Sequence, residues 1–360
     1  KSDEAYAYRG MVYIRQQKWD LAKADINKAI ELNSKSDEAY FARGFYHISQ
    51  QKLDSALADF NKAIELNPKS EYVYQFRGRL YLNQEKWDLA KVDFDKAIEL
   101  NSKSAEAYVY RGTAYIRQQK WDLAKVDFDK AIELNPNSAD AYFGRGIYHT
   151  ILQKLDLALA DYNKAIEINP NYADAYQFRG NLYLSQQKWD LAKADLDKAI
   201  EVKSSSDELY VSRGFLYLKQ QKWDLSKADS DKAIQINPNN PVAYNNRGFV
   251  YSQQKKWELA LVDLNKAIQI NPKMANAYNN RGFVYFQQKK WKLALADLNK
   301  AIQINPDYAK AYSYRGIVLS QTGNKQQAIQ DLQKAAQLFK TQNNTGYYEE
   351  VINKIQELQQ

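Results

Sequence analysis

The 360-residue sequence contains no cysteine and only two histidines. Without cysteine the chain forms no disulfide and no thiolate metal site. No stretch of about 18 apolar residues occurs either, which is the length a helix needs to cross a bilayer. These absences predict a soluble, cytoplasmic chain without a membrane span.

The formal net charge of +8 raises the possibility of a nucleic-acid partner. However, lysines recur evenly along the chain, as at Lys18, Lys52 and Lys86, and do not gather in one segment. Evenly spaced lysines are typical of a solvated helix face. The charge pattern therefore disfavours nucleic acid without excluding it.

An Arg-Gly pair recurs every 34 residues, with glycines at Gly10, Gly44, Gly78, Gly112, Gly146, Gly180, Gly214, Gly248, Gly282 and Gly316. A fixed period of this length indicates a supersecondary unit that cannot bury its apolar face alone and stacks on its neighbours as a solenoid. We predict ten tandem repeats over residues 3–342 that form one solenoid. Residues 343–360 are amphipathic and predict a C-terminal capping helix.

Each repeat contains two stretches with helical periodicity, for example 37–50 and 53–66 in the second repeat. The second stretch should end near Asn67-Pro68, because proline cannot continue a helix. A glycine in the middle of the first helix costs about 1 kcal/mol relative to alanine, so it needs a packing reason. We expect Ala56 and Ala63 on the second helix to meet this glycine.

In the second repeat the apolar and aromatic positions hold Tyr40, Gly44, His47, Ala56, Phe60, Ala63 and Pro68. This pattern resembles the tetratricopeptide repeat, and the match extends over all ten units. The resemblance implies an all-α fold, a right-handed α-α superhelix of helix-turn-helix units with a concave peptide-binding groove. Two positions depart from the family: arginine precedes the glycine in every unit, and the inter-helix glycine is present only as Gly323.

Each of these arginines is followed 16 residues later by an aspartate, as Arg9 is by Asp25. Both side chains should lie half-buried on facing helices of one repeat. We therefore predict a ladder of ion pairs within the repeats and no anion-binding role for these arginines.

His47 and His149 occupy a position where most repeats have tyrosine, and they lie in different repeats. Substitution within the core fits them better than metal binding, since no cysteine or second histidine is near. No nucleophile-base arrangement and no glycine-rich phosphate loop occurs. We expect no enzyme activity, no cofactor and no metal.

Residues that differ between repeats form one stripe on the first helix, at its second, fifth, ninth, twelfth and thirteenth residues. In the family that the chain resembles, this stripe lines the groove. It predicts a peptide-binding groove of Phe41, Phe45, Gln75, Arg79, Val109, Phe143, Ile147, Gln177, Asn181, Val211, Phe215, Asn245, Phe249, Asn279 and Phe283, with Arg15, Arg117, Lys219, Gln253 and Gln287 further along.

Some of these phenylalanines could instead pack between repeats. Asn245 and Asn279 resemble the asparagine ladders that hold an extended peptide in some family members. The lysine and asparagine pairs that bind acidic chaperone tails in other members are missing.

The function predicted from these observations is a protein-interaction scaffold that binds an extended or helical peptide of a partner in its groove. Two alternatives stay open. One is a helical repeat that binds RNA or another single-stranded nucleic acid, and the other is a structural array that associates end to end. Because Lys1-Ser2 repeats as Lys35-Ser36 at the end of a unit, we also expect the sequence to be part of a longer array.

Overall fold

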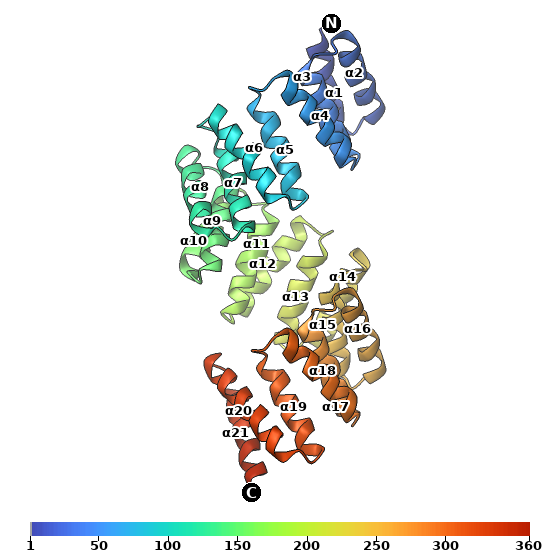
Figure 1. The fold of residues 1–360 in the computed structure, drawn as a ribbon, viewed down its shortest axis with the longest axis vertical. Coiled ribbons are helices and arrows are strands. Elements are labelled where there is room, and N and C mark those ends of the chain that lie inside the picture. Colours follow the sequence, from blue (N-terminus) through green and yellow to red (C-terminus); the bar gives the residue numbers. More distant parts are fainter. Residues whose placement is uncertain (1) are drawn as a thin grey trace. The chain divides into compact units, whose positions relative to one another are not determined.

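A computed structural model describes residues 2–360 of the chain, and every regular element in this part is a helix (Figure 1). The helices are α1 (Asp3–Arg15), α2 (Trp19–Leu32), α3 (Asp37–Ser49), α4 (Leu53–Leu66), α5 (Glu71–Asn83), α6 (Trp87–Leu100), α7 (Ala105–Arg117), α8 (Trp121–Leu134), α9 (Ala139–Ile151), α10 (Leu155–Ile168), α11 (Ala173–Ser185), α12 (Trp189–Val202), α13 (Asp207–Lys219), α14 (Trp223–Ile236), α15 (Pro241–Gln253), α16 (Trp257–Ile270), α17 (Ala275–Gln287), α18 (Trp291–Ile304), α19 (Ala309–Gln321), α20 (Lys325–Thr341) and α21 (Thr345–Gln359).

The helices group into two compact units, Lys1–Phe178 and Arg179–Gln360. Within each unit, successive helices pair as antiparallel hairpins, and each hairpin packs on the next. The predicted all-α fold of stacked hairpins is confirmed. The last helix, α21, packs on α20 through Val351 and Ile355, which are buried beside Phe339.

The first helices begin where the sequence offers a cap. Ser36 accepts a hydrogen bond from the backbone N–H of Ala39, and Asp37 and Glu38 place negative charge in the first turn of α3. Both features stabilise the N-terminal end of a helix. The predicted stretch 37–50 is helical to Ser49, and Gln50 is its C-cap.

The turn between the two helices of a repeat needs one residue in the left-handed region. Gly323 supplies it in the tenth repeat with φ of 85°, whereas Gln119 takes φ of 58° and Lys289 takes φ of 57° in theirs. A side chain makes this conformation less favourable by about 1 kcal/mol. The turn geometry therefore survives the loss of the family's glycine.

Asparagine ends most second helices. Asn67 is the C-cap of α4, and its side-chain oxygen accepts a hydrogen bond from the backbone N–H of Lys69. Asn101 makes the same bond to Lys103 in a repeat that has serine where the second has Pro68. The predicted stop is confirmed, and asparagine ends the helix even without proline.

The repeated glycine contacts a different residue from the one expected. A Cβ at Gly44 would lie 2.6 Å from Cε1 of Phe60, and a Cβ at Gly10 would lie 2.7 Å from Cγ1 of Ile26. Ala22 contributes only its carbonyl oxygen, 3.4 Å from that Cβ. The backbone of the alanine therefore does approach the glycine as expected, but the nearest atoms belong to the large side chain. The glycine leaves room for the large side chain between them.

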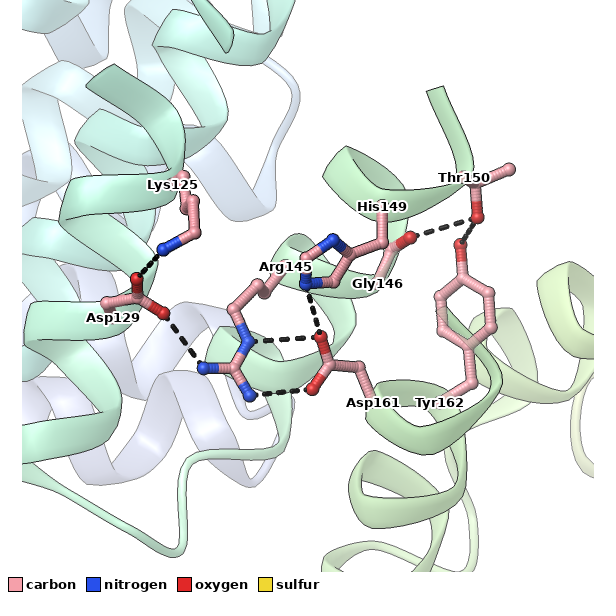
Figure 2. Close-up of polar contacts among 8 residues, drawn as sticks. All are labelled: Lys125, Asp129, Arg145, Gly146, His149, Thr150, Asp161 and Tyr162. Atoms are coloured by element: carbon pink, nitrogen blue, oxygen red, sulfur yellow. Dashed lines mark hydrogen bonds and ion pairs between the residues drawn. The ribbon is translucent and has the colours of Figure 1, made fainter. Parts of the chain in front are cut away.

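The predicted ladder of ion pairs is present in every repeat. In the fifth, Arg145 donates from Nε and Nη2 to the two carboxylate oxygens of Asp161 at 3.0 and 2.7 Å (Figure 2). Every aspartate of the ladder is buried. The pairs are Arg9–Asp25, Arg43–Asp59, Arg77–Asp93, Arg111–Asp127, Arg145–Asp161, Arg179–Asp195, Arg213–Asp229, Arg247–Asp263, Arg281–Asp297 and Arg315–Asp331.

Most of these arginines also bond to the preceding repeat, which the sequence did not lead us to expect. Nη1 of Arg145 donates to Asp129 at 2.8 Å, and Lys125 bonds to the same carboxylate (Figure 2). Burial alone would raise the pKa of Asp129, but the hydrogen bonds from Lys125 and Arg145 lower it. In other repeats the acceptor is a neutral asparagine, as in Arg281–Asn265 at 2.6 Å. Each such arginine thus ties two hairpins together.

Both histidines lie beside a ladder aspartate. Nδ1 of His47 is 3.0 Å from Asp59 Oδ2, and Nε2 of His149 is 3.7 Å from Asp161 Oδ2 (Figure 2). His149 is buried, as expected of a core substitution, whereas His47 is half-buried. Burial lowers the pKa of His149, so that its imidazole is neutral at pH 7.

Candidate functional site

Two hollows open on the first unit, and both are lined mainly by first helices. The smaller has a volume of about 310 Å³ and lies among α1, α3 and α5. The larger has a volume of about 780 Å³ and takes residues from four successive first helices, α5, α7, α9 and α11. We call the second, fifth, ninth, twelfth and thirteenth residues of the first helices the first-helix stripe.

The structure brings several predicted residues together around these hollows. The smaller is lined by Arg15, Phe41 and Phe45. The larger is lined by Arg79, Val109, Arg117, Phe143 and Ile147. In the first unit, these members of the first-helix stripe border the two hollows.

The fifth residue of the first helix packs between hairpins, although it was predicted to line the groove. Phe41 of α3 packs against Phe76, the sixth residue of α5, with ring centroids 5.1 Å apart. Phe143 of α9 packs in the same way against Phe178 of α11 at 5.2 Å. The fifth residue thus lies at a joint between hairpins. Those that are buried there are Phe41, Gln75, Val109, Asn245 and Asn279.

The two asparagines are the clearest departure from the predicted groove. Asn280 donates from Nδ2 to Asn245 Oδ1 at 2.9 Å, and Asn245 and Asn279 are 7% and 3% exposed. Their amides bond within the joint, so they are not presented to a ligand as an asparagine ladder would be.

The remaining predicted residues line neither hollow. Four are half-buried: Gln177, Val211, Phe249 and Phe283. Those that are exposed are Asn181, Phe215, Lys219, Gln253 and Gln287. Lys219 lies over the ring of Phe215, with Nζ 5.1 Å from the ring centroid.

Several aromatic residues of the hollows were not predicted. The larger hollow also contains Trp87 and Trp121, which begin α6 and α8, and Tyr110, the sixth residue of α7. The smaller contains Tyr8 and Phe76, also at the sixth position. The signal was available in the sequence, because the sixth residue varies as widely as the fifth and is often aromatic.

The larger hollow combines aromatic walls with two cations. Cζ of Arg79 lies 5.3 Å from the ring centroid of Phe76 and 4.9 Å from that of Tyr110, and Cζ of Arg117 lies 6.0 Å from Trp87. These separations are in the range of cation-π contacts. Burial raises the pKa of Tyr110, which Arg79 partly offsets.

One carboxylate, Asp140, borders the larger hollow and is already bonded. The hydroxyl of Tyr172 donates to Asp140 Oδ1 at 2.6 Å. Burial and this carboxylate raise the pKa of Tyr172, so the phenol stays protonated at neutral pH. The arrangement holds Asp140 in place and leaves Arg79 and Arg117 as the unpaired charges of the hollow.

Residues 2–360 contain no group of three or more histidine, aspartate or glutamate side chains placed to hold a metal ion. None of the helices in this part of the chain has both the length and the apolar character that a bilayer crossing requires. The chemistry that the hollows offer is that of binding, through aromatic surface and guanidinium donors.

Family models described as tetratricopeptide repeat match residues 3–36, 37–70, 72–104, 105–138, 139–172, 161–194, 207–240, 231–262, 275–308 and 298–330. A further TPR repeat model matches residues 250–289. No curated protein matches the chain closely enough to count as a relative.

Among solved structures, one similar fold is Cut9 with Hcn1, the APC/C hetero-tetramer, at 12% identity over 97% of this chain and 96% of that chain with a TM-score of 0.55. Another is PilF of Pseudomonas aeruginosa, at 18% identity over 60% of this chain and 98% of that chain with a TM-score of 0.54. These likenesses agree with the predicted α-α superhelix class. The chain belongs to the tetratricopeptide repeat family.

Proposed function

We propose that this chain is a protein-interaction scaffold that binds an extended or helical peptide segment of a partner along the first-helix stripe of its first unit. The larger hollow carries this proposal, because four successive first helices contribute to it and a bound segment would cross several repeats. Aromatic side chains and arginine are the residues that most often dominate binding energy at interfaces. Stacked repeats are also suited to extended binding surfaces.

The binding residues proposed for the larger hollow are Arg79, Arg117, Phe143 and Ile147 from the predicted groove, with Trp87, Tyr110 and Phe178 added. Asn245 and Asn279 are not included among the proposed binding residues, because they are buried and a ligand could reach them only by separating the packed helices. Phe215 and Lys219 are exposed on the second unit and lie outside the site proposed for the first unit.

Selection from a library of phage-displayed random peptides tests the proposal. Peptides selected on the intact chain should lose binding to an Ile147→Glu variant, because the carboxylate would replace apolar contact surface and compete with the peptide for Arg79 and Arg117. The matched control is Leu123→Glu on α8, since Leu123 is half-exposed and outside both hollows. Far-ultraviolet circular dichroism of both variants would establish that they fold.

Two outcomes contradict the proposal. One is that no peptide is enriched on the intact chain. The other is that the enriched peptides bind the folded Ile147→Glu variant as tightly as the unmodified chain.

A further inference from the structure

The arginines of this chain fall into two classes that differ in their partners. The ten ladder arginines each bond to a buried aspartate, as Arg111 does to Asp127 at 2.7 Å. Arg79 and Arg117 are exposed. Within the described part of the chain both make cation-π contacts, and neither side chain forms an ion pair or a hydrogen bond. Both border the larger hollow.

The aromatic contacts of these two arginines restrict their positions. Arg79 lies within 5.3 Å of the ring centroids of both Phe76 and Tyr110, and Arg117 lies beside Trp87. A guanidinium that stacks on an aromatic ring contacts the ring through its flat face. Its five N–H donors lie in the guanidinium plane and remain available to a ligand. Such donors fit a carboxylate in two parallel hydrogen bonds.

The wall around these cations is apolar. Phe143, Ile147 and Ile151 of α9 border the same hollow. The other charged residue there is Asp140, which accepts a hydrogen bond from Tyr172. A ligand that satisfies this surface needs both apolar side chains and negative charge.

On this basis, and resting on the proposed function, we infer that the larger hollow binds an acidic peptide segment in which an aromatic or aliphatic side chain enters the hollow and neighbouring carboxylates pair with Arg79 and Arg117. A nucleic-acid strand fits less well. Its backbone carries one charge per nucleotide and is bound through many cations, whereas this hollow has two and an apolar wall.

Binding of short synthetic peptides to the full chain tests the inference by fluorescence anisotropy. One set carries phenylalanine or leucine between two glutamates at varied spacing, and the other carries glutamine in place of each glutamate. The acidic set should bind about tenfold more tightly, and this preference should weaken as salt is added. A uridine oligonucleotide of similar length serves as the nucleic-acid probe.

The Arg79→Gln, Arg117→Gln double variant should lose the preference and bind both peptide sets equally. The matched control is the Lys69→Gln, Lys103→Gln double variant, which removes the same charge from two exposed side chains of the first unit outside both hollows. The control should keep the tenfold preference. Circular dichroism spectra should be the same for all variants, because the altered side chains lie outside the ladder.

The inference is overturned if the acidic and neutral peptides bind the unmodified chain equally, if the double variant keeps the preference, or if the oligonucleotide binds more tightly than every peptide. Absence of binding by all of these peptides overturns it as well. The phage selection decides the proposed function separately, because peptides of any charge that depend on Ile147 would support it.

Discussion

The first-helix stripe of the first unit differs from that of the repeats containing α15 and α17 in the second unit. In the first unit, Gly144 at the sixth position of α9 has no side chain, the ring of Phe128 packs against it, and a hollow of about 780 Å³ is bordered by this residue and Val109. Between α15 and α17 the equivalent residue is Asn280, whose amide bonds to Asn245 at 2.9 Å. The same repeat position therefore borders a hollow or forms a hydrogen-bonded joint, according to the side chain that the next repeat places there.

The largest expected effect concerns the ladder, which both regions share. Asp161→Ala in the first unit and Asp263→Ala in the second should each lower the free energy of unfolding by about 3 kcal/mol, because each leaves a half-buried arginine without its carboxylate. Urea denaturation followed by circular dichroism measures both. A loss below about 1 kcal/mol in either variant would show that the ladder adds little to stability there.

Gly144→Ala should close part of the hollow and destabilise the fifth repeat. The added Cβ would lie 2.3 Å from Cε1 of the buried Phe128, so the ring must move. Overpacking of this kind costs about 1 to 3 kcal/mol. The free energy of unfolding measured by urea denaturation and the affinity for a selected peptide should both decline. An unchanged affinity would show that ligands do not use this part of the hollow.

Asn280→Ala removes the bond that closes the joint in the second unit. Asn245 Oδ1 would then be buried without a donor, at a cost of about 1 to 2 kcal/mol. The loss should be visible in urea denaturation, with Asn181→Ala as a control at an exposed position. Equal stability of the two variants would contradict the closed joint.

The smallest effect is the pH dependence that His149 gives to the first unit. Its folded-state pKa is lowered by burial, so the unfolded chain binds a proton more readily. The contribution of His149 to stability is therefore present above pH 6.5 and lost as the pH falls below that value. His149→Tyr introduces tyrosine, the residue found at the same repeat position in other repeats as Tyr115 and Tyr285. This variant should show a smaller change of stability with pH between about pH 5 and 7. An unchanged pH profile in thermal denaturation would assign the titration to other groups.

The features predicted correctly from the sequence depend on contacts within one repeat. Arg9 and Asp25 recur at a fixed spacing on two helices of one hairpin, so their pairing follows from the period. The bond from Arg145 to Asp129 and the packing of Phe41 on Phe76 join different repeats. Their geometry depends on how hairpins stack.

The structure places part of the predicted stripe at the edges of the two hollows and buries other members of it. Periodicity places Gln75 and Asn245 on the same stripe as Arg79, but both are buried, and they are hydrogen-bonded to Ser104 and Asn280. Trp87 and Trp121 were missed because they belong to second helices. Variation between repeats identified a surface without distinguishing its open residues from its joints.

The central claim is that Arg79 and Arg117 border open space while Asn245 and Asn279 are closed into a joint. Because the chain contains no cysteine, a single cysteine introduced at each position reports its own accessibility to a maleimide. Cysteines at 79 and 117 should react nearly as fast as in the urea-unfolded chain. Those at 245 and 279 should react at least about tenfold more slowly, because the maleimide can reach them only when the joint unfolds locally. Equal native-state rates at all four positions would contradict the account.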